Sequence, residues 1–157
     1  MSTTVPFNPP PSASTDTMLQ LDNQLCFALY SASLAMTKVY KPLLETIGLT
    51  YPQYLVMLVL WEQDRLSVSE IGERLCLDSG TLTPLLKRLE TSGWLTRRRA
   101  ADDERRVQVG LTPAGHLLKT QATGIPSCVV EATHCDLPEL VALTRQVQAL
   151  RDQLAQH

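Results

Sequence analysis

Four cysteines, at positions 26, 76, 128 and 135, carry the side chains of this sequence that are best suited to redox chemistry. A thiolate that attacks a peroxide becomes a sulfenic acid, which a second thiol converts to a disulfide. The wide spacing of the four lacks the close Cys-x-x-Cys pairs of a zinc module, and a chain of 157 residues does not need a disulfide scaffold. We therefore interpret any disulfide here as transient and redox-sensing rather than structural.

The residue pattern alone does not single out one of these cysteines. Cys26 lies among apolar residues, and a single cysteine on a helix is most often an inert core residue. Cys76 follows Leu75 on the apolar side of a short predicted helix, so we predict that it belongs to the core.

A second chemical feature is a basic segment, residues 87–106. It contains seven of the 14 Lys and Arg residues and four acidic residues, so its net charge is +3, whereas the rest of the chain carries −5. A local basic patch of this kind is suited to binding the phosphates of nucleic acid, although a solvated charged hairpin has the same composition.

The first element that must position these groups is a long helix. Between Met18 and Ile47 apolar residues recur at steps of three and four, which predicts an amphipathic helix, kinked ahead of Pro42 and ending at Gly48. Residues 50–53 then form a capping box and begin a second, buried helix.

The middle of the chain follows the order of a helix-turn-helix. Another capping box, at 67–70, begins a short helix that ends at about Cys76, and a third helix covers about residues 79–92. Gly93 is a natural end for that third helix. Its predicted inner face consists of Leu82, Leu85, Leu86 and Leu89.

The segments 94–99 and 105–111 are predicted strands joined by a polar turn, which makes a basic β-hairpin. Thr112 and Pro113 begin a helix that is kinked or broken and ends at about His134. Asp136 caps a last helix, whose apolar stripe contains Leu140, Leu143, Val147, Leu150 and Leu154.

This order predicts a mainly α fold with a small β-hairpin wing, a winged helix-turn-helix. The N-terminus of the second helix of such a unit reads base edges in the major groove, and arginines of the hairpin reach the minor groove or flanking phosphates. We expect Asp78 to cap that helix rather than contact DNA. The predicted DNA-binding residues are Ser79, Gly80, Thr81, Thr83, Lys87, Arg88, Arg97, Arg99, Asp102, Arg105 and Arg106.

Four parts follow from these elements. Residues 1–17 are a flexible arm, 18–49 a dimerisation and sensor helix, 50–112 the winged helix-turn-helix, and 113–157 the C-terminal dimerisation helices, all in one continuous folded unit. One recognition helix reads only a few base pairs, so we expect a homodimer on a pseudo-palindromic operator in double-stranded DNA.

The composition bounds the class of protein. With 44% apolar and 19% charged residues the chain has an ordinary globular composition, and no apolar run approaches the roughly 18 residues of a membrane span. The N-terminal residues do not show the basic region followed by an apolar stretch that is typical of a signal peptide. We therefore expect a cytoplasmic protein. We expect no membrane partner, metal or cofactor.

The residues also resemble a known family. The string LDSGTLTPLLKRLE, residues 77–90, and the following GWLTRRRAADDERRVQVGLTPAG, residues 93–115, resemble the MarR family of repressors. LDNQLCFALY, residues 21–30, and KVYKPLLETIGLTYPQYLVMLVLWE, residues 38–62, are similar to the organic hydroperoxide repressors within that family. The resemblance covers about residues 18–155.

This resemblance implies a peroxide-sensing function for a protein that is not an enzyme. The resemblance implies that the organic hydroperoxide oxidises Cys26. It also implies that Tyr40 and Tyr51 of the partner chain hold this cysteine at the dimer interface. A tyrosine O–H can donate to a thiolate, and such a bond lowers the pKa of a thiol. The second cysteine of the intersubunit disulfide is Cys128, with Cys135 as the alternative. The resulting shift would release the operator.

Three other hypotheses about the function stay open at this point. A MarR-type regulator could instead bind a small aromatic or phenolic ligand beside Tyr40 and Tyr51, with Cys26 only structural. A metal sensor could use Cys128, His134 and Cys135, although this spacing matches no recognised zinc pattern. A thiol peroxidase would leave the arginine hairpin unexplained.

Overall fold

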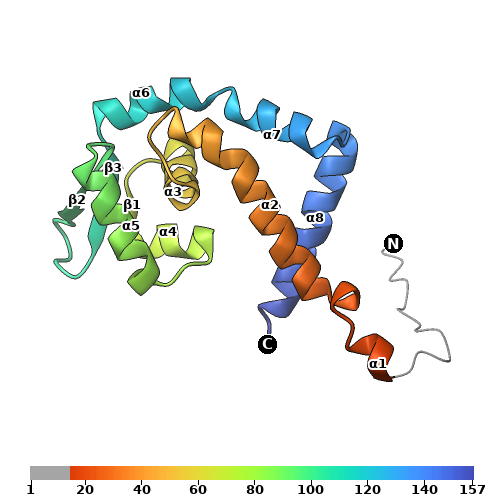
Figure 1. Ribbon diagram of the computed structural model, residues 1–157. Coiled ribbons are helices and arrows are strands. Elements are labelled where there is room, and N and C mark those ends of the chain that lie inside the picture. Colours follow the sequence, from red (N-terminus) through yellow and green to blue (C-terminus); the bar gives the residue numbers. More distant parts are fainter. Residues whose placement is uncertain (1–14) are drawn as a thin grey trace. The chain divides into compact units, whose positions relative to one another are not determined.

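The computed structural model describes residues 15–157, which fall into two compact units (Figure 1). The first unit ends at Lys38, and the second comprises Val39–His157. Most of the predicted flexible arm, residues 1–17, lies outside the described residues. Its last three residues belong to a short helix.

The first unit begins its long helix later than the sequence predicts. A short helix α1 (Thr15–Met18) and a 3₁₀ turn (Leu21–Asn23) precede α2 (Leu25–Glu45), which carries on into the second unit. The expected start at Met18 is therefore wrong by seven residues. The side-chain amide of Gln24 donates to the backbone carbonyls of Met18 and Gln20, at 2.7 and 3.0 Å, and so takes the acceptors that a continuing helix would use. At the other end Pro42 lies inside α2 without ending it.

The second unit is built on the winged helix-turn-helix that the sequence predicts. In chain order its elements are α3 (Tyr51–Glu62), β1 (Leu66–Ser67), α4 (Val68–Leu75), α5 (Ser79–Thr91), β2 (Leu95–Arg99) and β3 (Val107–Leu111). The three strands form an antiparallel sheet in the order β1-β3-β2, with Leu66 opposite Val109 and Leu95 opposite Leu111. The hairpin is confirmed, but β1 was not predicted, because two residues are too short to give a strand pattern.

The core of this unit lies where α3, α4, α5 and the sheet meet. The predicted inner face of α5 is confirmed, since Leu82, Leu85, Leu86 and Leu89 are all buried. Val56 and Met57 of α3 are completely buried and pack in the same cluster. Burial of such side chains contributes about 1.5–3 kcal/mol each, so this cluster fixes the position of α5 against the sheet.

Helix caps explain where these elements begin. The predicted capping box of α4 is present: the Glu70 backbone N–H donates to Ser67 Oγ at 3.2 Å, and the Ser67 N–H donates to the Glu70 carboxylate at 2.7 Å. At α3, the Thr50 N–H donates to Gln53 Oε1 at 2.9 Å. Gly93 has φ +83° and ends α5, as expected.

Three helices complete the chain: α6 (Pro113–Ala122), α7 (Ile125–Thr133) and α8 (Leu137–Leu154). The break that the sequence predicts before His134 is the boundary between α6 and α7. Asp136 caps α8 by accepting the Glu139 N–H at 2.8 Å. No helix of residues 15–157 is long and apolar enough to cross a membrane.

The prediction that Cys76 is a core residue is wrong. Cys76 is exposed and has φ +56°, because the chain reverses there between α4 and α5. The Leu77 N–H donates to the Gly72 carbonyl at 2.9 Å, and a Cβ on Gly72 would lie 2.8 Å from the Leu77 carbonyl oxygen. This tight closure turns the Cys76 side chain out of the apolar face that sequence spacing assigns to it.

Candidate nucleic-acid interface and thiol sites

The N-terminus of α5 presents small polar residues on a fixed cap. Asp78 accepts the Thr81 N–H at 2.8 Å, so its predicted role as the cap is confirmed. This backbone N–H group also holds the pKa of the Asp78 carboxyl below its usual value. Ser79, Gly80 and Thr81 are exposed beside it. The free N–H groups and hydroxyls of this turn are suited to hydrogen bonds with base edges and phosphates.

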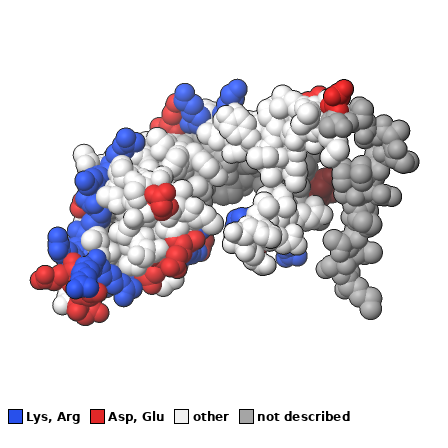
Figure 2. Space-filling model, turned by 90° about the horizontal axis from the view of Figure 1, so that it is seen from below, with Lys and Arg blue, Asp and Glu red and all other residues white. Residues whose placement is uncertain are grey.

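A groove of about 280 Å³ joins this helix to the wing. Ser79 and Thr83 line it from α5, and Arg97, Arg105 and Arg106 line it from the hairpin. Figure 2 shows many Lys and Arg side chains around the hairpin, with Asp and Glu side chains among them. The structure thus brings together, on one surface, polar residues of α5 and hairpin arginines that lie 14 to 27 positions apart in the sequence.

The hairpin arginines are not equivalent. The Arg97 guanidinium is paired with Glu90 of α5, with 2.8 Å between Nη2 and Oε2, and this bond keeps the pKa of Glu90 below its usual value. Arg106 Nη2 lies 3.3 Å from the Glu70 carboxylate of α4. These two pairs tie the wing to the two helices, so Arg97, which is half-buried, positions the hairpin as well as lining the groove.

The tip of the hairpin carries the remaining predicted DNA-binding residues. Arg99 donates to the Glu104 carbonyl at 3.3 Å, and Asp102 and Arg105 are exposed. Asp103 accepts the backbone N–H of Arg105 at 3.0 Å and thereby shapes the turn, rather than pairing with a guanidinium. The exposed side chain of Arg105 is free to reach outward from this turn.

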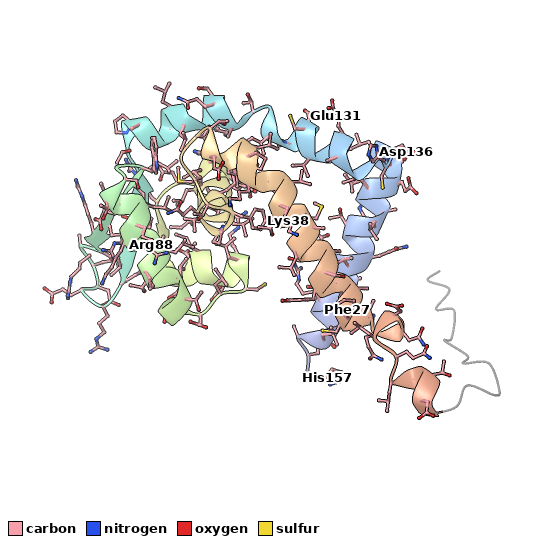
Figure 3. The ribbon with its side chains drawn as sticks, viewed as in Figure 1. Phe27, Lys38, Arg88, Glu131, Asp136 and His157 are labelled. Atoms are coloured by element: carbon pink, nitrogen blue, oxygen red, sulfur yellow. The ribbon has the colours of Figure 1, made fainter. Side chains whose placement is uncertain are left out.

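Two further basic residues, Lys87 and Arg88, are exposed on α5; Arg88 is marked in Figure 3. They lie nine and ten residues beyond the cap Asp78, which is between two and three turns along the helix. At this distance they suit the phosphate backbone better than base edges, because only the first turns of a recognition helix enter the groove deeply.

The two tyrosines predicted to support a thiolate lie together in the second unit. The ring centroids of Tyr40, on α2, and Tyr51, on α3, are 4.8 Å apart, and both side chains are half-buried. Burial raises the pKa of both hydroxyls, so they remain protonated donors at neutral pH.

Sequence reasoning missed the rest of this aromatic cluster. The Tyr54 ring, 3% exposed, lies 5.9 Å from Tyr40 and 6.3 Å from Trp61. The Trp61 indole N–H donates to the Gly115 carbonyl of α6 at 3.0 Å. The run of apolar letters in α3 gives no sign of this, because the contact is made to a residue 54 positions away in the chain.

The cysteines differ in their surroundings. Cys26, in the first turn of α2, and Cys128, on α7, are both exposed. Cys135 is half-buried, and its Sγ lies 3.5 Å from the Thr133 carbonyl oxygen, to which the thiol donates. Among residues 15–157 no three His, Cys, Asp or Glu side chains form a group that could hold a metal ion, so Cys128, His134 and Cys135 do not gather into one.

With this geometry in place, the chain can be compared with known proteins. A family model described as transcriptional regulator SarA/Rot matches residues 38–121. The organic hydroperoxide resistance transcriptional regulator of Bacillus subtilis is 48% identical over 138 residues, which are 88% of this chain and 94% of that protein. The chain belongs to the MarR/SarA family of transcriptional regulators.

Solved structures of MarR/SarA regulators have the same fold. Reduced AbfR bound to DNA has a TM-score of 0.76 and 35% identity, and the match covers 87% of this chain and 93% of that one. AbfR with its disulfide formed has a TM-score of 0.59 and 37% identity, over 90% of this chain and 94% of that one. One of these regulators is therefore known both on DNA and in a disulfide state. The winged helix-turn-helix predicted from the sequence is confirmed.

Proposed function

We propose that this chain is a transcriptional repressor that binds operator DNA as a homodimer and releases it when an organic hydroperoxide oxidises Cys26. The observation that carries the DNA half is the groove where Ser79 and Thr83 of the recognition helix meet the three hairpin arginines. The sensing half rests on the exposed thiol at position 26 and on the similarity to an organic hydroperoxide resistance regulator. A repressor of this kind acts in the cytoplasm and is not an enzyme.

The dimer is supported by apolar side chains that each unit leaves exposed. In the first unit Leu25 and Tyr30 are each 61% exposed. In the second, Leu143 and Leu154 of α8 are 51% and 62% exposed. Apolar surface of this extent is unusual for a monomer, and burial against a second copy of the chain removes it from water.

The proposed redox chemistry has two steps. The Cys26 thiolate attacks one peroxide oxygen, the O–O bond breaks, an alcohol leaves, and the sulfur becomes a sulfenic acid. A second thiol then attacks that sulfur, the S–S bond forms, and the hydroxyl leaves as water. The disulfide forms only when the two Cα atoms approach within about 7 Å, so helices of the dimer have to move. That movement takes the two recognition helices out of register with the operator.

Cys128 is the proposed partner in this disulfide, and Cys135 is the alternative. The exposure of Cys128 favours attack from another subunit. The half-buried thiol of Cys135 already donates to the Thr133 carbonyl, so its reaction has to break that contact first.

The test of this function compares oxidants with ligands. The reduced protein selects a duplex from a random pool, and fluorescence anisotropy follows its release. We expect one equivalent of cumene hydroperoxide per subunit to weaken binding, and dithiothreitol to restore it. Salicylate and similar phenolic compounds should have no effect. Release by a phenolic compound but not by the peroxide would contradict the proposal and favour a ligand pocket beside Tyr40 and Tyr51, whose clustered rings could line it.

The proposed role of the tyrosines gives a sharper prediction, based on mixed dimers. One subunit carries Cys26→Ser and the other carries Tyr40→Phe with Tyr51→Phe, so the single Cys26 can meet only the intact tyrosines of its partner. We expect this dimer to react with peroxide at the rate per thiol of the wild type, because the O–H donors stabilise the thiolate across the interface.

The matched control places all three substitutions in one subunit and leaves the other wild type. Its single Cys26 then faces two phenylalanines, and we expect its reaction to slow by about tenfold, the effect of losing roughly 1.4 kcal/mol of hydrogen bonding to a charged group. Stopped-flow quenching of tryptophan fluorescence measures both rates. Equal rates in the two mixed dimers would contradict the assignment to the partner chain.

A further inference from the structure

The wing has a second face that the proposed function leaves unused. Successive side chains of a strand point to opposite faces, so Thr96 and Arg98 face away from Arg97 and Arg99. On this second face the structure has an open cavity of about 580 Å³. It is lined by Asp64, Arg65, Thr96, Arg98, Gln108, Gly110, Leu111, Pro113 and His116.

Arg65 is held against this face by its backbone. Its φ of +60° is in the left-handed region, which is unfavourable for a residue with a side chain. Asp64 stabilises this conformation, because its Oδ1 accepts the N–H groups of Arg65 and Leu111, both at 2.8 Å. Gln108 adds a hydrogen bond from its side chain to the Arg65 carbonyl at 3.3 Å. The turn at Asp64 and Arg65 is thus attached to β3 by two hydrogen bonds, one to Leu111 and one from Gln108.

The stem of Arg65 lies over a glycine of the sheet. A Cβ on Gly110 would be in ordinary van der Waals contact with Arg65 Cγ, at 3.8 Å, so the arginine stem passes directly over this glycine. Arg98 extends from the neighbouring strand, since Arg98 is paired with Gln108 in the register of β2 and β3. Two guanidinium groups are therefore presented on the same side of the wing.

The charge of this cavity is positive. Its acidic residue, Asp64, is already engaged: Oδ1 accepts two backbone N–H groups, and Oδ2 lies 3.2 Å from His116 Nε2. Arg65 and Arg98 are both exposed, and within residues 15–157 neither takes part in an ion pair. An anionic group is the ligand that this arrangement is suited to bind, because a guanidinium presents two N–H donors to a phosphate.

We infer that Arg65 and Arg98 form a second phosphate-binding surface for operator DNA, on the side of the wing opposite the groove between α5 and the hairpin (the α5 groove). A hairpin that enters the minor groove lies between two sugar-phosphate strands, so phosphates meet both of its faces. The arginines of the α5 groove would contact the phosphates of one DNA strand, and Arg65 and Arg98 would contact the phosphates of the other. The inference rests on the proposed DNA-binding function and adds residues that sequence reasoning did not assign to it.

The test measures how the affinity of the reduced dimer for a selected duplex depends on salt. Each lost phosphate contact makes the slope of log K against log salt less negative by about 0.9. Arg65→Gln or Arg98→Gln removes two contacts per dimer, so we expect a change of about 1.8 for each single variant and about 3.6 for the double variant. Near 100 mM salt each substitution should also weaken binding by more than tenfold.

Two controls keep the result specific. Arg145→Gln makes the same change of charge on α8, outside the wing, and should leave the slope unchanged as long as size-exclusion chromatography shows that the variant is still a dimer. Arg65→Lys with Arg98→Lys keeps the charges and should retain most of the slope, which separates a phosphate contact from a loss of folding. A wild-type slope in the double glutamine variant would overturn the inference while leaving the proposed function intact. A wild-type dimer that selects no duplex would overturn both.

A small anion as the occupant would give a different pattern. Pyrophosphate would then raise the melting temperature of the wild type and not of the double variant, and the salt slope for DNA would be the same in both. That outcome contradicts the DNA assignment.

Discussion

We expect a Cys26→Ser dimer to bind its operator equally well before and after treatment with cumene hydroperoxide. Serine has nearly the same size but cannot form a sulfenic acid, so neither the oxidation nor the disulfide that follows it can occur. In the wild type, the same treatment should lower operator affinity by about 10³-fold, or roughly 4 kcal/mol, which is enough to abandon specific binding. Fluorescence anisotropy with a labelled duplex measures both affinities.

The matched control for this result is Cys76→Ser. Cys76 is also exposed, and it lies three residues before Ser79 at the N-terminus of the recognition helix, so a non-specific thiol effect would act there first. We expect Cys76→Ser to respond to peroxide as the wild type does. Release of DNA from the Cys26→Ser dimer, or a loss of response in Cys76→Ser, would show that the sensing thiol is misassigned.

The second large effect concerns the stability of the fold at Gly115. A Cβ on this residue would overlap the backbone carbonyl of Trp94, which directly precedes β2, and a backbone oxygen cannot move aside as a flexible side chain can. That carbonyl also accepts the Thr112 N–H at 3.1 Å, and the Gly115 carbonyl accepts the Trp61 indole N–H. Gly115→Ala should therefore lower the free energy of unfolding by about 2–3 kcal/mol.

Gly124→Ala is the control for this change. Gly124 has φ −82°, and a Cβ there would meet nothing within 4 Å, so alanine fits without strain. We expect Gly124→Ala to be neutral or to stabilise the fold by up to about 1 kcal/mol, because alanine loses less backbone freedom on folding. Urea unfolding at one fixed protein concentration compares the two, since the stability of a dimer depends on concentration. Equal stabilities of the two variants would contradict the packing of α6 on the wing.

Local signals predicted most of this fold. Capping residues such as Ser67, Asp78 and Asp136 mark where helices begin, because each satisfies N–H groups of the first turn through its own side chain. Gly93 ends α5 for an equally local reason, its positive φ. Features of this kind depend on residues three or four positions apart and are visible in a single sequence.

Features that depend on distant contacts were missed. The strand β1 exists only because Leu66 and Ser67 pair with β3, more than forty positions away. The exposure of Cys76 follows from the reversal of the chain at Cys76, where Leu77 closes back on Gly72, and this overrides the apolar spacing of α4. Apolar periodicity cannot show either effect.

The candidate site also has a part that local sequence signals predicted and a part that depends on distant contacts. The residue types and their order were enough to predict the basic hairpin and the polar start of α5. The sequence could not predict that Arg97 would pair with Glu90, or that Arg65 would lie over Gly110 on the other face. The choice of Cys26 came from resemblance to a family, because the sequence around a single cysteine does not show whether its thiol is exposed or buried in the core.

The measurement that tests the central claim most directly is a peptide map of the four cysteines, made on the same sample in which operator release is followed. The reduced dimer on its duplex receives one equivalent of cumene hydroperoxide, and free thiols are alkylated at intervals before digestion. We predict that a disulfide-linked peptide containing Cys26 and Cys128, or Cys26 and Cys135, accumulates in step with DNA release, and that dithiothreitol reverses both. Release of DNA while Cys26 is still recovered as a free, alkylated thiol would contradict the account.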